Sequence, residues 1–235
     1  GSGKTTLCEK LEDLLINKKV SCCILSLDDF YLSKAKRREL ADRIHPLAFT
    51  RGVPGTHDIN LLKRVLAKLS EKSPSSKIKT PIFSKLSDDL LPKKRWRVCP
   101  PYPQIIIIEG WCVGAEPSFL TKSPYTPWEK KNDPEGLWKS WTRRESGQYQ
   151  SIWETLDFMI FIKQDDFEQV VDNRWNQEVR NFKNAGVKPS VSHQDIREFC
   201  YHFETWTHGL WNCLPGIADL TITCAPNYDY SWPKN

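Results

Sequence analysis

The 235-residue chain lacks several features that would identify its class at once. No apolar run approaches the length of a membrane-spanning helix, so we expect no membrane partner. The eight cysteines form no Cys-x-x-Cys pair and no compact zinc spacing, which argues against a zinc module. Most of them lie in or beside apolar stretches, where a cysteine acts as a small hydrophobe. This usage favours a reduced, cytoplasmic compartment over a disulfide scaffold.

The chain also lacks a large excess of charge of one sign. The 34 Lys and Arg against 29 Asp and Glu leave a net charge of +5. This small excess suits anionic ligands but does not require nucleic acid, and we expect no nucleic-acid partner. The basic run at residues 93–97 (KKRWR) is most simply a solvated loop, with anion binding as the alternative.

The chain begins with the second half of a phosphate-binding loop. Its first residues are Gly1, Ser2, Gly3, Lys4, Thr5 and Thr6. In the full pattern, a glycine and four residues precede Gly-Lys-Ser/Thr. Backbone N–H groups of such a loop wrap the β-phosphate of ATP, the lysine reaches the β- and γ-oxygens, and the threonine ligates Mg²⁺. A flexible Gly/Ser linker is the alternative, but leucines at positions 7, 11, 14 and 15 follow at helical spacing.

Apolar runs and helical patterns alternate along the rest of the chain, which predicts an α/β fold with a mostly parallel sheet. Residues 105–108 are four consecutive isoleucines, the clearest buried strand. Residues 121–150, rich in Trp, Pro and charge, are expected to form an insertion or helical excursion. The expected helices cover 4–18, 59–69, 166–183 and 193–211, and the expected strands cover 20–27, 105–108, 158–163 and 220–224.

Carboxylates follow two of these strands. Asp28 and Asp29 come after the first apolar run, and Glu109 follows the isoleucines. Ligands of open α/β sheets bind at the carboxyl ends of the strands, so these groups are expected beside the phosphate loop. Phosphoryl transfer needs a carboxylate to orient and deprotonate the attacking hydroxyl, and Mg²⁺ to neutralise oxygen charge. The alternative for each carboxylate is a turn, a helix cap or a solvated strand end.

The segment 50–58 (TRGVPGTHD) holds two glycines and a proline, which indicates a tight loop. Arg51 can hold a carboxylate with two parallel hydrogen bonds, and His57 can hydrogen-bond a substrate hydroxyl. Asp58 is equally suited to capping the helix that follows and to binding substrate. Lys85 is a candidate contact for an anion. Arg174 could pair with Glu178 one helical turn away or close over the transferred phosphate.

Taken together, these strings closely resemble the D-glycerate 3-kinase family, which is related to phosphoribulokinase, uridine kinase and pantothenate kinase. The resemblance runs essentially from end to end, and TRGVPGTHD is far more selective than the phosphate loop. The matching segments are 26–32 (SLDDFYL), 45–47 (HPL), 50–58 (TRGVPGTHD), 109–114 (EGWCVG), Arg174 with Gln177 and Glu178, and 218–220 (ADL).

The resemblance implies a P-loop kinase: a three-layer sandwich with helices on both faces of the sheet and a lid. It implies transfer of the ATP γ-phosphoryl to a hydroxyl of D-glycerate or a similar hydroxy acid. In this reading residues 1–6 hold ATP, with Lys4 on its phosphates, while Thr5 and Glu109 support Mg²⁺. Arg174 belongs to the lid.

On the acceptor side, the resemblance makes Asp28 the general base, with Asp29 as the alternative base or a substrate ligand. The other residues expected to face the substrate are Tyr31, Arg51, His57, Asp58 and Lys85.

The chain departs from the family pattern at two places, which bear on the acceptor more than on ATP. Ser84 stands where an aspartate is frequent, and Asp172-Asn173 precede Arg174 where Gly-Trp is frequent. A kinase-like ATP-binding protein without phosphotransfer and a kinase of another small acceptor, similar to pantothenate or ribulose phosphate, are therefore alternatives. A nucleic-acid-binding ATPase is a third alternative, which rests only on the net charge of +5 and the basic run at residues 93–97. We also expect residues 1–235 to be one kinase domain that lacks the strand before its phosphate loop.

Overall fold

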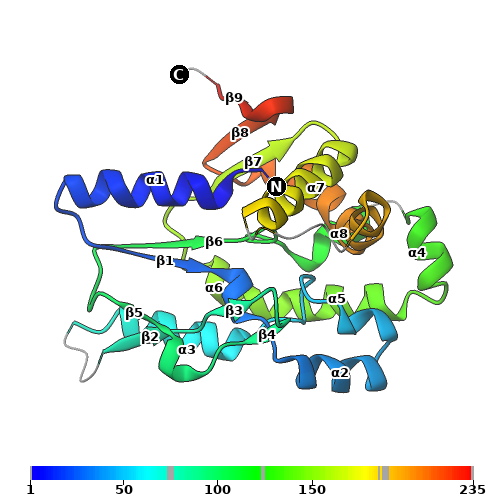
Figure 1. Ribbon diagram of the computed structural model, residues 1–235, viewed down its shortest axis with the longest axis horizontal. Coiled ribbons are helices and arrows are strands. Elements are labelled where there is room, and N and C mark those ends of the chain that lie inside the picture. Colours follow the sequence, from blue (N-terminus) through cyan, green and yellow to red (C-terminus); the bar gives the residue numbers. More distant parts are fainter. Residues whose placement is uncertain (1, 73–76, 123–124, 185, 187–190, 234–235) are drawn as a thin grey trace. The chain divides into compact units, whose positions relative to one another are not determined.

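A computed structural model describes residues 2–72, 77–122, 125–184, 186 and 191–233 (Figure 1). The chain forms two compact units. Unit 1 comprises Gly1–Lys4, Ala115–Pro134 and Thr155–Asn235, and unit 2 comprises Thr5–Gly114 and Glu135–Glu154. Each unit is described by itself.

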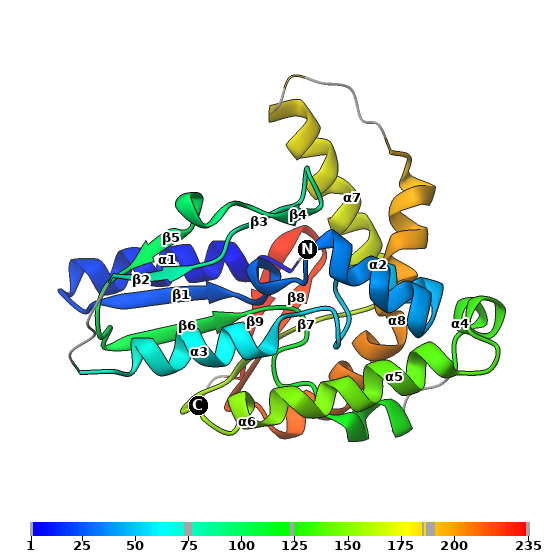
Figure 2. The same ribbon diagram turned by 90° about the horizontal axis from the view of Figure 1, so that it is seen from below.

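Unit 2 is built on two parallel strands, β1 and β6. Their register places Ser26 opposite Glu109, so both strands end at the same level. Helices α1 and α3 lie on opposite sides of this strand pair (Figures 1 and 2). The strands of unit 2 are β1 Cys22–Ser26, β2 Ile78–Thr80, β3 Phe83–Ser84, β4 Asp89–Leu90, β5 Arg97–Cys99 and β6 Ile105–Glu109. Its α-helices are α1 Lys4–Asn17, α2 Lys34–Arg43, α3 Ile59–Leu69, α5 Leu137–Ser146 and α6 Gln150–Trp153.

Short 3₁₀ helices connect these elements: η1 Leu27–Phe30, η2 Pro46–Phe49, η3 Lys93–Arg95 and η5 Gly147–Tyr149. Strands β2 and β5 pair antiparallel, and β3 and β4 form a second antiparallel pair. Helix α3 buries Ile59, Leu62, Val65 and Leu69 along one face. Helix α1 buries only Cys8, and Leu14 is 56% exposed, so its predicted apolar stripe is only partly covered.

Unit 1 carries strands β7 Ile160–Gln164, β8 Leu220–Ala225 and β9 Asp229–Ser231. Strands β7 and β8 are parallel, and β9 pairs antiparallel with β8. The helices of unit 1 are η4 Pro117–Lys122, α4 Pro127–Asn132, α7 Phe167–Asn184, α8 His193–Cys213, η6 Leu214–Gly216 and η7 Pro226–Tyr228.

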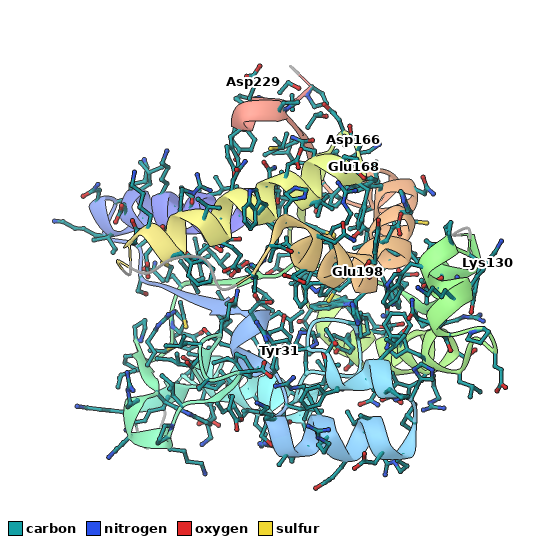
Figure 3. The ribbon with its side chains drawn as sticks, turned by 45° about the vertical axis from the view of Figure 1, so that its right-hand side comes forward. Tyr31, Lys130, Asp166, Glu168, Glu198 and Asp229 are labelled. Atoms are coloured by element: carbon teal, nitrogen blue, oxygen red, sulfur yellow. The ribbon has the colours of Figure 1, made fainter. Side chains whose placement is uncertain are left out.

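Helices α7 and α8 share the apolar core of unit 1. Phe167 and Val171 of α7 pack with Ile196 and Cys200 of α8. Helix α8 starts at a capping box, in which the side chains and backbone of Ser192 and Asp195 bond reciprocally. Figure 3 labels Glu198 of α8, which accepts a hydrogen bond of 3.1 Å from Trp128.

The α/β class, the parallel strand pairs and each expected helix and strand are confirmed, with ends that differ by at most two residues. In the predicted excursion, Trp138 and Trp141 are buried as expected, whereas Trp128 is half-buried. Residues 123–124 lie outside the described residues. That the chain works as one domain with residues 121–150 as an insertion stays a prediction. No helix in the described parts of the chain is both long and apolar enough to cross a membrane.

Candidate active site

The phosphate loop leads into α1, with Ser2, Gly3 and Lys4 in unit 1 and Thr5 and Thr6 in unit 2. Gly3 has φ +80°, a conformation that favours glycine, and α1 begins at the next residue, Lys4. The Lys4 ammonium donates to Ser2 Oγ at 3.2 Å. The Tyr230 hydroxyl donates to the Ser2 carbonyl at 3.2 Å, so β9 supports the loop. Gly1 lies outside the described residues.

The predicted metal ligands are Thr5 and Glu109. Thr5 is in the first turn of α1, and half-buried Glu109 ends β6. Mg²⁺ prefers oxygen ligands and usually binds through one or two protein groups, substrate phosphates and water. A hydroxyl and a carboxylate fit that chemistry. Among the described residues, no group of three or more His, Cys, Asp or Glu side chains could hold a metal by itself.

The two aspartates after β1 have different partners. Asp28 accepts hydrogen bonds from the Tyr31 hydroxyl at 2.7 Å and from the Lys85 ammonium at 2.8 Å. Burial alone would raise the pKa of Asp28, but the charge and hydrogen bond of Lys85, with the hydrogen bond of Tyr31, lower it to about 2. Asp28 is therefore ionised at neutral pH.

Asp29 instead accepts the backbone N–H of Phe83 at 3.0 Å and so ties η1 to β3. Burial raises the pKa of Asp29, partly offset by that hydrogen bond. Figure 3 labels Tyr31, which lies at the end of η1.

The ends of β1 and β6 are packed tightly together. A Cβ atom on Gly110, just after Glu109, would lie 2.8 Å from the Leu27 Cβ, so only glycine fits there. The Trp111 indole N–H donates to the Gly52 carbonyl at 3.0 Å. The strand ends and the 50–58 loop are therefore joined within unit 2.

Internal hydrogen bonds hold the 50–58 loop in place. Thr56 Oγ1 accepts from the Gly52 N–H at 2.9 Å and donates to the Val53 carbonyl at 2.7 Å. The Asp58 N–H donates to the Phe30 carbonyl at 2.7 Å, which fixes the loop to η1. Asp58 Oδ1 accepts the Leu61 N–H at 2.8 Å, so the predicted helix cap is confirmed.

His57 is buried beneath this loop. Its ring stacks on Tyr31 with 4.7 Å between centroids, and its Nδ1 lies 2.8 Å from the Tyr149 hydroxyl. The Gly55 N–H donates to that hydroxyl at 3.0 Å, so Tyr149 joins the loop backbone to the His57 ring. Burial lowers the pKa of His57 to about 4, so the ring is neutral at pH 7. Its Nε2 has no hydrogen-bond partner within the described part of the chain.

Arg51 bonds with a residue far away in the sequence. Its Nη1 contacts Asp88 Oδ1 at 2.5 Å, and its guanidinium carbon lies 5.6 Å from the Phe83 ring centroid. Asp88 also contacts Arg37 Nη2 at 2.9 Å. The structure thus gives Arg51 a carboxylate partner from the protein itself, through Nη1.

Arg174 lies on α7 in unit 1. It contacts Glu178 and donates to Gln177 at 3.2 Å, which confirms the predicted pairing one turn apart. Its guanidinium carbon lies 5.8 Å from the Phe199 ring centroid. The buried Arg174 Nε has no hydrogen-bond partner among the described residues.

A cavity of about 250 Å³ opens beside His57 and Asp58 in unit 2. Lys36 and Leu40 of α2 line this cavity, together with Leu32 and Tyr149. The residues predicted from the sequence to form the site are divided between the two units. Unit 2 holds Thr5, Thr6, Asp28, Asp29, Tyr31, Arg51, His57, Asp58, Lys85 and Glu109. Unit 1 holds Ser2, Gly3, Lys4 and Arg174.

The sequence reading missed three residues of this site: Arg37, Asp88 and Tyr149. Each is recognisable only through its partner, because 37 residues separate Arg51 from Asp88 and 92 separate His57 from Tyr149. Tyr149 alone has a weak signal in the sequence, because it lies in the segment 121–150, which is rich in aromatic residues.

Comparisons with known proteins show which proteins the chain resembles. No protein-family model matches the chain. The uncharacterized kinase mug58 of Schizosaccharomyces pombe is 30% identical over 214 residues, which cover 86% of this chain and 75% of that protein. The chloroplastic D-glycerate 3-kinase of Arabidopsis thaliana is 32% identical over 124 residues, 50% of this chain and 27% of that protein.

A solved structure shows the same fold. The D-glycerate 3-kinase from Cryptococcus neoformans matches with a TM-score of 0.77 and 20% identity, over 98% of this chain and 86% of that one. At this identity the likeness establishes the P-loop kinase fold. With the relative from fission yeast, it shows that the chain belongs to the D-glycerate 3-kinase-like family of P-loop kinases, which use ATP, and that it is a phosphotransferase with an alcohol group as acceptor.

Proposed function

We propose that the chain transfers the γ-phosphoryl group of ATP to a hydroxyl of D-glycerate or a similar small hydroxy acid. The observation that carries this proposal is that unit 2 holds both an ionised carboxylate, Asp28, and an arginine, Arg51, each bonded to a residue of the same hairpin. Asp28 and Arg51 are both fixed by the β3–β4 hairpin, through Lys85 and Asp88. A hydroxy acid offers a hydroxyl to the first and a carboxylate to the second.

In this mechanism Asp28 accepts a hydrogen bond from the acceptor hydroxyl and takes its proton as the oxygen attacks the γ-phosphorus. The bond to the β–γ bridging oxygen breaks, and ADP leaves. Phosphoryl transfer depends mainly on positioning and charge stabilisation, so an ionised carboxylate of low pKa is sufficient. Asp29 is a weaker candidate for the base, because it already accepts the Phe83 N–H.

On the nucleotide side, Lys4 and the backbone N–H groups of residues 1–6 would hold the ATP phosphates at the start of α1. Thr5 and Glu109 would hold Mg²⁺, which neutralises phosphate oxygen charge when bound. Arg174 would stabilise the transferred phosphoryl group. Its buried Nε finds no hydrogen-bond partner in the described part of the chain, which supports this role, because such an N–H is costly unless a ligand satisfies it.

The remaining residues would surround the acceptor. Lys85 shares Asp28 with the acceptor hydroxyl, and Tyr31 orients the Asp28 carboxylate from the other side. His57 and Asp58 would contact the remaining hydroxyl groups. His57 is neutral at pH 7 and so can serve as an uncharged hydrogen-bond donor.

The test is acceptor-dependent ADP release, measured with D-glycerate, other hydroxy acids, sugars and pantothenate. Asp28→Asn should lower turnover about 10² to 10⁴-fold, because it removes the base while ATP binding persists. Asp29→Asn is the matched control and should have the smaller effect on turnover. ATP binding without turnover on any acceptor would instead indicate a kinase-like binding protein and reject the proposal.

A further inference from the structure

Asp88 lies between two arginines at the turn of the β3–β4 hairpin. Its Oδ1 contacts Arg51 Nη1 at 2.5 Å, and its Oδ2 contacts Arg37 Nη2 at 2.9 Å. Two guanidinium charges against one carboxylate leave one positive charge in this cluster. The sequence analysis gives Arg51 a role toward the acceptor but assigns none to Arg37 or Asp88.

Arg37 fixes Asp88 in place. Its side chain is 1% exposed and donates to the backbone carbonyls of Leu32 at 3.2 Å, Phe49 at 2.8 Å and Asp88 at 2.7 Å. Arg37 therefore holds both the carboxylate and the backbone of Asp88. Withdrawing Asp88 would leave a buried charge uncompensated, which is strongly unfavourable. Asp88 is thus a fixed part of the site and not a group that the acceptor displaces.

The backbone of Asp88 supports the same conclusion. Its φ of +53° lies in the left-handed region, which non-glycine residues adopt at a cost. Such a conformation persists only when the surroundings determine it. The hydrogen bond from Arg37 to the Asp88 carbonyl supplies that determination.

Arg51 is held by one nitrogen and one face. Nη1 bonds to Asp88, and the Phe83 ring lies against the guanidinium plane. A guanidinium has five N–H donors in a fixed fork, so bonding at Nη1 leaves the edge formed by Nη2 and Nε. Within the described part of the chain, Arg51 has no other hydrogen-bond partner, and its side chain is 18% exposed.

We propose that Asp88 is the positioning residue that aims Arg51 at the carboxylate of the acceptor and so sets the preference for anionic over neutral acceptors. This inference rests on the proposed function. Asp88 fixes the plane and direction of the guanidinium fork. The acceptor carboxylate then binds the remaining edge with two hydrogen bonds and neutralises the remaining positive charge.

Asp89 provides a matched control on the same hairpin. Its Oδ1 accepts the Lys34 N–H at 3.1 Å and the Leu90 N–H at 2.8 Å. Among the described residues, Asp89 forms no hydrogen bond or ion pair with Arg37 or Arg51. Asp89→Asn therefore makes the same chemical change one residue away without touching the arginine cluster.

The experiment compares D-glycerate with glycerol, its neutral analogue, in steady-state kinetics at saturating ATP. Asp88→Asn should raise the KM for D-glycerate about tenfold, change kcat less than about threefold, and lower the D-glycerate-to-glycerol ratio of kcat/KM about tenfold. Asp89→Asn should leave KM and the ratio at the wild-type values. A purely structural role would lower kcat for both acceptors together with the melting temperature, and that result would overturn the inference.

A second variant covers the case in which Asp88→Asn does not fold. Asp88→Glu keeps the charge beside Arg37 but moves the carboxylate by one methylene group, and it should also raise the KM for D-glycerate. A folded Asp88→Glu with wild-type KM would overturn the inference. If the wild-type chain phosphorylates D-glycerate but the Asp88 variants match Asp89→Asn, only the inference fails. If the wild-type chain does not phosphorylate any hydroxy acid, the proposed function fails and the inference falls with it.

Discussion

Two arginines that sequence motifs single out, Arg51 in the 50–58 loop and Arg174 on α7, are held in different ways. Arg174 pairs with Glu178, one helical turn away on its own helix. Arg51 pairs with Asp88, 37 residues away on a separate hairpin, and Asp88 is itself held by the buried Arg37. A pair at i,i+4 forms wherever the helix forms, whereas the Arg51 pair forms only when the hairpin packs correctly.

The packing around the two arginines differs as well. The loop that carries Arg51 is built closely against other segments, with Gly55 against Trp141 and His57 against Tyr149. Arg174 has a neighbouring ring, Phe199, and otherwise partners on its own helix. We therefore expect substitutions around the 50–58 loop to affect stability and acceptor binding, and substitutions around Arg174 to affect turnover with little effect on stability.

The largest effect is expected at Gly55. Its φ of +97° disfavours any side chain, and an added Cβ would lie 2.6 Å from Trp141 Cζ2. Gly55→Ala should reduce the free energy of unfolding by about 2–4 kcal/mol through strain and overpacking. Urea denaturation measures this. Gly216→Ala is the control, because no atom of the described residues lies within 4 Å of its Cβ position. Equal stability of the two variants would contradict the close packing of the 50–58 loop.

The next effect is a pH dependence at His57. Its pKa falls from 6.5 in the unfolded chain to about 4 when buried, so the folded state resists protonation. The stability that this contributes is complete above pH 6.5 and is lost as the pH falls toward 4, by at most about 1.4 kcal/mol per pH unit. We expect the free energy of unfolding, measured with denaturant at several pH values, to depend less steeply on pH in His57→Gln than in the wild-type chain. His193→Gln, at a histidine whose side chain is 39% exposed, is the control. An unchanged slope in His57→Gln would show that His57 is not buried neutral.

Parallel substitutions of the two arginines by lysine test the difference in function. Arg51→Lys should raise the acceptor KM about tenfold, because a lysine cannot form the paired hydrogen bonds. Arg174→Lys should instead lower kcat about tenfold or more while leaving the acceptor KM nearly unchanged. Steady-state kinetics with varied acceptor separate the two outcomes. If both variants changed the same parameter, the two arginines would not have the separate roles proposed.

The smallest effect is expected at Glu178. Glu178→Gln removes the charge that pairs with Arg174, and such helix pairs contribute about 0.2–0.5 kcal/mol. The melting temperature should therefore stay nearly constant. A large loss of stability would mean that the Arg174 pair is as tightly integrated as the Arg51 cluster.

Much of the local structure could be predicted from the sequence. The isoleucine run predicts β6, the leucine spacing predicts α1, and Asp58 is recognisable as the cap of α3. These features depend on residues within a few positions of one another, where periodicity and capping chemistry apply. The strings at 26–32 and 50–58 likewise predict most of the residues proposed to face the acceptor, because each string is contiguous.

The partners of the site residues could not be predicted in this way. Asp28 and Asp29 are adjacent and chemically identical, yet one bonds to Lys85 and Tyr31 and the other to the Phe83 backbone. The difference depends on where β3 packs against η1, which no local pattern encodes.

The sequence by itself determined which segments are helices and strands, and which short strings carry the chemistry of a P-loop kinase. The tertiary structure decided which charged groups neutralise one another: Lys85 with Asp28, and Asp88 with Arg37 and Arg51. The physical reason is that hydrogen-bond and charge energies depend on distances of a few ångströms. Between residues from separate loops, only the packing of the folded chain sets those distances.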